Sequence, residues 1–159
     1  MTVRNLDKLF APKSAAVMGA SGQPARVGSV VLANLLRGGF AGPVWPVNPK
    51  YRTLEGLRCY ADVRALPGTP DLAVIVVPPA AVPGQIAALG EIGCRAAVVL
   101  TAGLSTQMAP DGRTLQQAML DAAKPHLLRI LGPNGIGTMI PGLKLNASFA
   151  HTEAQPGQL

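Results

Sequence analysis

Aromatic residues, cysteines and long apolar runs are scarce in this chain, and each shortage excludes a class of protein. Aromatics make up only 4% of the 159 residues, so the stacking platforms typical of single-stranded nucleic-acid binding are missing. The two cysteines, Cys59 and Cys94, form no CxxC pair, which fits free thiols in a reducing compartment. The longest apolar strand-like run, residues 72–77, is far too short to cross a bilayer. We therefore expect a cytoplasmic protein with no membrane partner.

Signatures of catalysis are also missing. The chain contains no GxSxG nucleophile motif, no HExxH zinc motif and no Walker lysine motif. The sequence reveals no carboxylate or nucleophile partner for His126 or His151, so we expect both to be structural or exposed. We predict no catalytic residue and no metal site, in a chain that holds a ligand without turning it over.

The charge balance favours an anionic partner. With 14 Lys and Arg against 8 Asp and Glu, the formal net charge is +6, which attracts anions over a long range. The basic residues are scattered along the chain, however, and no aromatic residues accompany them in the manner of a nucleic-acid surface. We therefore expect a small anionic ligand and no nucleic acid.

Five short apolar runs with little polar alternation are typical of strands buried on both faces of a parallel sheet. They are residues 15–18, 44–47, 72–77, 96–100 and 127–131. Segments of helical period follow the first, third and fourth runs. This alternation predicts an α/β fold, a doubly wound parallel sheet of Rossmann-like type. The connection 51–71 is too irregular to predict a full helix.

Several residues indicate where elements and the domain end. Gly38-Gly39 is a C-terminal signal for the helix that begins near Val27. Asn5 is predicted to cap a brief helix whose Leu6, Leu9 and Phe10 pack on the sheet edge. The pattern ends near Phe149, so we interpret 1–149 as one ligand-binding domain and the polar residues 150–159 as a linker toward a following domain.

The turn after the first strand is the most informative feature of the sequence. Gly19-Ala20-Ser21-Gly22-Gln23-Pro24 leads from a buried strand into a helix, so it aims unpaired N–H groups and the positive helix end at one point, as a phosphate requires. Arg26 disfavours the helix dipole there unless an anion lies beside it. After the second strand, Lys50 stands where an NAD-binding chain usually has an acid, and it favours another phosphate.

Loops after neighbouring parallel strands meet at the carboxyl edge of the sheet, where ligands bind. Pro78 and Pro79 remove backbone donors and stiffen an apolar lip that suits an adenine ring. The predicted cofactor-binding residues are Gly19, Ser21, Gly22, Gln23, Pro24, Arg26, Asn48, Pro49, Lys50, Val77, Pro78, Pro79, Thr101, Ala102, Gly103 and Asn134.

These residues can also be interpreted without any ligand. The spacing of Gly19, Gly22 and Gly28 differs from GxGxxG, so the glycines could serve only the packing of a tight turn. Lys50 could equally be a solvated surface lysine.

Six blocks in order carry a resemblance that covers nearly the whole chain: residues 16–21, 46–50, 71–78, 96–103, 131–134 and 145–149. Together they resemble the N-terminal CoA-binding domain of NDP-forming acyl-CoA synthetases, relatives of the succinyl-CoA synthetase alpha subunit. The resemblance implies CoA or acyl-CoA as ligand, with residues 21–24 near its phosphates and Lys50 contacting a phosphate. It also implies that residues 77–79 lie beside the adenosine and residues 101–103 near the pantetheine arm.

The resemblance further implies an ADP-forming acid–CoA ligase whose phosphohistidine and ATP-grasp parts lie outside this chain, because neither histidine stands at a matching position. The same domain occurs in bacterial protein lysine acetyltransferases with an appended GNAT domain, so a regulatory acyl-CoA sensor is one alternative. An NADP-binding reductase or redox sensor is another, because Lys50 could meet a 2′-phosphate.

Overall fold

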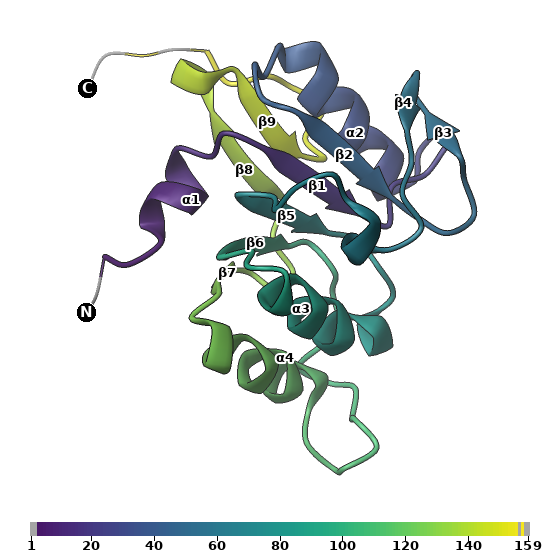
Figure 1. The fold of residues 1–159 in the computed structure, drawn as a ribbon, viewed down its shortest axis with the longest axis vertical. Helices are drawn as coiled ribbons and strands as arrows, with labels where there is room; N and C mark the ends of the chain where they lie inside the picture. The colour runs from purple at the N-terminus through teal and green to yellow at the C-terminus, as the bar shows by residue number, and fades with distance from the viewer. Residues whose placement is uncertain (1–2, 156, 158–159) are drawn as a thin grey trace.

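A five-stranded parallel sheet forms the centre of the molecule in the computed structural model, which describes residues 3–155 and 157. Figure 1 shows the strands in the spatial order β2-β1-β5-β6-β7. Their bounds are β1 Ala15–Met18, β2 Val44–Val47, β5 Leu72–Ile75, β6 Ala96–Val99 and β7 Arg129–Leu131. Every residue of β1, β5 and β6 is buried, as expected of apolar strands covered on both faces.

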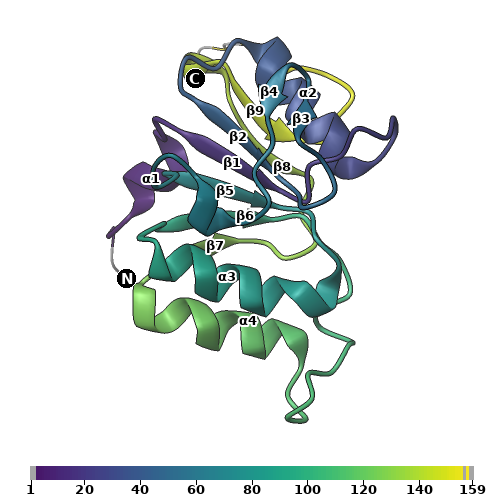
Figure 2. The ribbon, with the colours of Figure 1, turned by 45° about the vertical axis from the view of Figure 1, so that its right-hand side comes forward.

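Helices cover both faces of the sheet and make two apolar cores. Figure 2 shows α3 (Val82–Glu91) and α4 (Leu115–Ala123) side by side on one face, with α2 (Val27–Gly38) on the other. Ile75 and Val99 pack with the α3 and α4 side, whereas Val74 and Val98 pack with the α2 side. The prediction of a doubly wound α/β fold is therefore confirmed.

The predicted strands and helices are present, with shifted ends. α2 ends where expected, because Gly39 takes a left-handed conformation at its C-terminus. β5 ends at Ile75, two residues before the predicted end of that run. β7 begins only at Arg129, because Leu127 is left-handed after the 3-10 turn η3 (Lys124–His126).

The irregular connection between β2 and β5 contains no α-helix, as predicted. It holds a small hairpin of β3 (Thr53–Leu54) and β4 (Leu57–Arg58), followed by the 3-10 turn η1 (Val63–Ala65). An ion pair of 2.9 Å between Arg64 and Glu91 joins η1 to the end of α3. This connection therefore packs beside α3.

The sequence did not predict the antiparallel pair of β8 (Gly137–Ile140) and β9 (Leu145–Ser148), which are joined by η4 (Pro141–Leu143). β9 packs along α2 and is buried throughout. The Asn34 side chain of α2 donates hydrogen bonds to the carbonyls of Ser148 (2.9 Å) and Ala150 (3.0 Å). This hairpin completes the layer that covers the α2 face of the sheet.

The N-terminal helix α1 (Leu6–Phe10) follows Asn5 as predicted, but two details of the prediction are wrong. Asn5 does not cap the helix, because its amide donates to the carbonyl of Leu127 at 2.8 Å. Phe10 is 54% exposed, since in so short a helix only Leu9 faces the sheet squarely enough to be buried.

The ion pair of Lys8 and Asp71, with 2.9 Å between Nζ and Oδ1, ties α1 to the start of β5. Burial raises the pKa of the Asp71 carboxyl, but the Lys8 hydrogen bond, the Lys13 N–H and both lysine charges outweigh burial and leave that pKa lowered. Asp71 therefore stays ionised as an anchor for the N-terminal segment.

Candidate ligand-binding site

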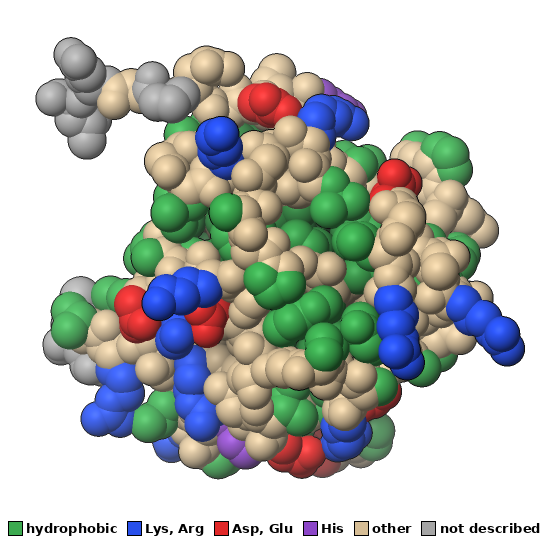
Figure 3. Space-filling model, turned by 45° about the horizontal axis from the view of Figure 1, so that its top comes forward, with side chains coloured by type: hydrophobic (Ala, Val, Ile, Leu, Met, Phe, Trp, Pro, Cys, Tyr) green, Lys and Arg blue, Asp and Glu red, His purple; other side chains and the backbone are tan. Residues whose placement is uncertain are grey.

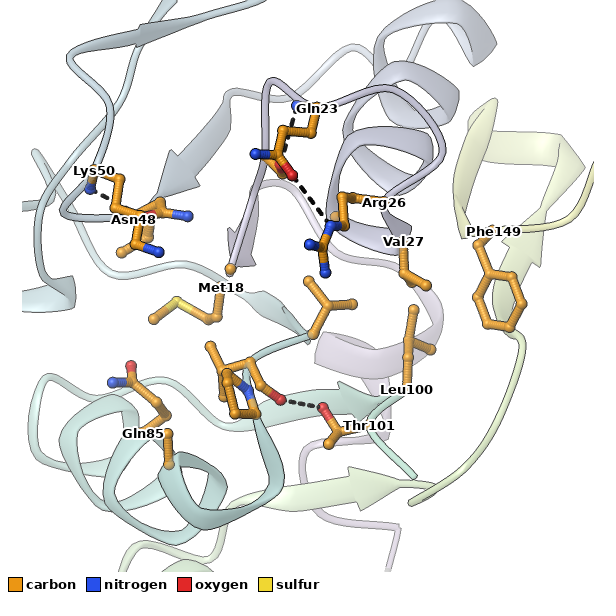
Figure 4. Close-up of a pocket in the computed structure, with 18 of the residues that line it drawn as sticks. Met18, Gln23, Arg26, Val27, Asn48, Lys50, Gln85, Leu100, Thr101 and Phe149 are labelled. Carbon is orange, nitrogen blue, oxygen red and sulfur yellow. Dashed lines mark hydrogen bonds between the residues drawn. The ribbon is translucent and has the colours of Figure 1, made fainter. Parts of the chain in front are cut away.

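A cavity of about 970 Å³ opens at the carboxyl edge of the sheet, within the usual size range of small-molecule sites. β2 and β5 lie on opposite sides of β1, so the chain reverses its direction of winding there, where α/β sheets of this type bind ligands. The lining comes from the loops after all five strands, together with the first turns of α2 and α3 (Figure 4).

The turn after β1 forms the first wall and depends on two glycines. Gly19 has a φ of +86°, and its N–H donates to the Val47 carbonyl at 2.9 Å. Gly28, in the first turn of α2, lies so close to this turn that a Cβ there would come within 2.1 Å of the Gly19 carbonyl oxygen. The start of α2 therefore rests directly on the turn and cannot accept a side chain.

The N-terminus of α2 faces the cavity with free donors. Arg26 precedes the helix, and no side chain caps it. Within the described part of the chain, no backbone or side-chain acceptor receives the N–H groups of Val27 and Gly28, which both line the cavity. The Nε of Arg26 donates to Oε1 of Gln23 at 3.2 Å, so the cation lies beside the same turn (Figure 4). An anion here would meet the helix end and a guanidinium together.

The loop after β2 forms the second wall. The Asn48 side chain donates to the Ala20 carbonyl at 2.8 Å and accepts from the Lys50 N–H at 2.9 Å. The Asn48 amide therefore ties the loops after β1 and β2 together. Lys50 is exposed at the rim and makes no ion pair within the described chain, so its ammonium group is available to an anionic ligand.

The loop after β5 forms an apolar third wall. Val77 and Pro78 line it, and proline contributes no N–H. The Thr101 hydroxyl, from the loop after β6, donates to the Val77 carbonyl at 2.8 Å and holds the two loops together. Gln85 reaches this wall from α3 (Figure 4).

The face that Figure 3 shows carries a group of Lys and Arg side chains at its lower left, beside Asp or Glu side chains, and further basic side chains at its top and right. The charge that matters to a ligand in the cavity comes from Arg26, Lys50 and the α2 terminus.

The cavity lining contains all but four of the predicted residues; Gly22, Pro24, Pro79 and Gly103 are outside it. Gly22 is exposed beside Tyr51 and Leu54, where a Cβ would lie 3.4 Å and 3.2 Å from their side chains. Pro24 is exposed, Pro79 begins the 3-10 turn η2 (Pro79–Ala81), and Gly103 lies beside Gln107.

Several lining residues were not among the predicted ones. They are Met18, Val27, Gly28, Val47, Tyr51, Ala61, Asp62, Val76, Ala81, Gln85, Leu100, Gly135, Ile136 and Phe149. Most are neighbours of predicted residues and follow from the same strand ends. Asp62, Gln85 and Phe149 come from elements whose packing the sequence pattern did not reveal.

The histidines and cysteines lie outside the cavity lining. The His126 ring packs on α3 where a Cβ at Gly90 would lie 2.3 Å from it, and His151 is exposed after β9. Burial raises the pKa of the Cys59 thiol, and it raises that of Cys94 to about 11. Both thiols are therefore protonated near neutral pH and are poor nucleophiles.

The described residues contain neither a cluster of metal ligands nor a helix suited to a membrane. Nowhere in residues 3–155 and 157 do three or more His, Cys, Asp or Glu side chains come together as metal ligands would. None of the helices in this part of the chain has the length and apolar character needed to cross a bilayer.

The arrangement fits an elongated anionic ligand with an apolar ring. Free N–H groups and Arg26 lie together at one place, Lys50 stands at the rim, and Val77 and Pro78 offer an apolar surface. Gly28 leaves the helix end open to close approach. This donor set matches the phosphates and adenosine of CoA, the ligand that the sequence resemblance implies.

Comparison with known proteins agrees with this geometry. The family model for CoA binding domains matches residues 13–141. The chain is 35% identical over 98% of its length to the alpha subunit of an ADP-forming acetate–CoA ligase (I) of Pyrococcus furiosus. It is 40% identical over 87% of its length to an ADP-forming acetate–CoA ligase of Methanocaldococcus jannaschii. The chain spans only 34% and 19% of the lengths of these relatives.

A solved structure has the same fold. The dinucleotide-forming acetyl-coenzyme A synthetase 1 of Candidatus Korarchaeum cryptofilum, in complex with phosphate and ADP, superimposes with a TM-score of 0.83 at 40% identity. The match covers 91% of this chain and 30% of that one.

Proposed function

The chain belongs to the CoA-binding domain family, and from this we propose that it is the CoA-binding part of a larger ADP-forming acid–CoA ligase. The observation that carries the proposal is the cavity at the switch point of the sheet. It brings together the α2 N-terminus, a lysine at the end of β2 and an apolar lip at the end of β5.

The proposal assigns the parts of CoA to the walls of the cavity. The N–H groups of Val27 and Gly28, with Ser21, Gln23 and Arg26, receive the diphosphate. Lys50 receives the 3′-phosphate, and Val77 and Pro78 contact the adenosine. Thr101 and Ala102 lie along the pantetheine arm. When bound, CoA supplies the thiol that accepts an acyl group.

The proposed ligase reaction needs further parts, since the relatives named ligases are much longer than this chain. Neither histidine lines the cavity, so a phosphorylated histidine next to the ligand would come from another domain or subunit. The role of this chain is then to bind CoA and orient it at the sheet edge. The carboxylic acid that would be joined to CoA belongs to those other parts.

Calorimetric titration of the 159-residue chain with CoA, dephospho-CoA and NADP tests the proposal. We expect CoA to bind best and dephospho-CoA to lose about 1 to 3 kcal/mol with the missing charge-assisted contact. NADP carries adenosine and phosphates but no pantetheine, so it should bind more weakly than CoA. Tighter binding of NADP, or no binding of CoA, would refute the proposal.

A further inference from the structure

We propose that Gln85 recognises the edge of the adenine base and makes this site selective for adenine; the inference rests on the proposed binding of CoA. Gln85 is the fourth residue of α3 and lines the cavity beside the apolar lip. Its part in base recognition goes beyond the phosphate and pantetheine contacts assigned above.

The position of Gln85 on α3 directs its amide toward the cavity. Ala81 precedes it by four residues, and both line the cavity, as expected of side chains on one helical face. The methyl side chain of Ala81 fills little of the space in front of the longer Gln85. Figure 4 shows Gln85 below Asn48 and Lys50 and apart from Arg26 and Val27.

The amide of Gln85 is available to a ligand. Within the described part of the chain, no residue donates to its oxygen or accepts from its nitrogen. Among the other amides of the lining, Asn48 donates to the Ala20 carbonyl and the oxygen of Gln23 accepts from Arg26. Asn134 also lines the cavity, but it comes from the loop after β7 and not from α3. Gln85 thus presents one donor and one acceptor, both without a protein partner, next to the lip formed by Val77 and Pro78.

Charge favours the base at this end of the cavity. Asp62 lines the cavity just before η1, where its carboxylate accepts from the Arg64 N–H at 2.8 Å and forms an ion pair of 3.5 Å with the Arg64 guanidinium. Asp62 and Gln85 both line the cavity. Arg26 and the α2 terminus attract a diphosphate, whereas Asp62, balanced by Arg64, offers it no positive charge. The neutral base is therefore favoured near Gln85.

The chemistry of the amide matches adenine. Adenine presents a donor at N6 next to an acceptor at N7, and a glutamine amide pairs with both at once. Hypoxanthine carries an oxygen at position 6, so it offers two acceptors on that edge and the bidentate pair is lost. A site that forms such a pair rejects the analogue that lacks it, because a polar group is left without its partner.

The test compares CoA with its analogue that carries hypoxanthine in place of adenine. We expect the wild-type chain to bind CoA about tenfold more tightly than the analogue. In Gln85→Leu, which keeps the size of the side chain but removes its amide, we expect weaker CoA binding and little preference between the two ligands. Gln116→Leu, on α4 outside the cavity lining, is the matched control and should keep the wild-type preference.

Each outcome of this titration bears on a different claim. If wild type and Gln85→Leu show the same preference for CoA over the analogue, Gln85 does not read the base, although the chain still binds CoA. If wild type fails to bind CoA at all, the proposed function and this inference both fail. Gln85→Ala is measured in parallel, with a thermal unfolding curve for each variant, so that poor folding of one substitution does not decide the result.

Discussion

The contact between α2 and the turn after β1 can be tested by adding one methyl group, as in Gly28→Ala. The new Cβ would lie 2.1 Å from the Gly19 carbonyl oxygen and 3.2 Å from the Cα of Ala20. Ordinary contact begins at 3.4 Å, so the helix and the turn must separate by about 1.3 Å. Gly19 cannot easily yield, because its N–H is bonded to Val47 and its Cα faces the backbone of Val76.

Two effects of this substitution oppose each other. Forcing a group into a packed contact costs about 1 to 3 kcal/mol, and a clash between backbone atoms belongs at the upper end of that range. Replacing glycine by alanine within a helix recovers up to about 1 kcal/mol. We therefore expect Gly28→Ala to lower the free energy of unfolding by about 1 to 2 kcal/mol. CoA affinity should fall about tenfold, because the Val27 and Gly28 N–H groups move away from the anion.

Gly84→Ala provides the matched control. Gly84 also lies near the start of a helix, α3, but a Cβ there would meet nothing within 4 Å. The same change should stabilise the chain by about 0.5 to 1 kcal/mol through helix propensity alone. Urea denaturation of both variants, with the slopes compared, measures the difference. If Gly28→Ala proves as stable as Gly84→Ala, the close approach described here is wrong.

Two further predictions concern charged groups. Lys8→Ala should lower the free energy of unfolding by about 0.5 to 1 kcal/mol at pH 7. The pKa of Asp71 is lowered in the folded state, so the stability difference between wild type and variant should have its full size above pH ~5. It should shrink as the pH falls below the unfolded value of ~3.9, because Asp71 then becomes protonated. Denaturation between pH 3 and 7, with the exposed Lys124→Ala as control, measures it, and a loss independent of pH would contradict the assignment. Lys50→Ala should weaken binding of CoA much more than binding of dephospho-CoA in calorimetry; equal losses would remove Lys50 from recognition of the 3′-phosphate.

Much of the fold was predictable because it depends on local signals. The apolar runs of β1 and β6 have no polar alternation, and both strands are buried throughout. The end of α2 follows from the glycine that adopts a left-handed conformation there. These features require only the chemistry of neighbouring residues. The family resemblance then extended the prediction from the fold to the ligand.

Features that depend on distant contacts were not predictable in the same way. β8 is only half-buried, and its pairing with β9 follows from packing on α2, more than a hundred residues earlier in the chain. Asparagine is a residue type that often caps helices, but the side-chain amide of Asn5 donates to the carbonyl of Leu127 instead. The sequence gives no sign that Gln85 differs from other helical residues, and its place in the cavity lining follows only from the position of α3.

The same difference explains the four predicted residues outside the cavity lining. A loop can be assigned to the carboxyl edge from its place after a strand, but the direction of each residue depends on backbone angles and neighbours. Gly22 lies in the correct turn, yet it is exposed beside Tyr51 and Leu54 and does not line the cavity. Pro79 starts a 3-10 turn just after Pro78, so only the first of the two prolines lines the cavity.

The hydrogen bonds from Asn34 to Ser148 and Ala150 bear on where a fragment of this protein can be cut. The family match ends at residue 141, between the two strands of the last hairpin. A fragment that ends at residue 141 would lack β9 and would expose the apolar side of α2 to water. The amide of Asn34 would also lose both of its acceptors. Any shortened version meant for crystallisation or ligand screening should therefore keep everything through Ala150.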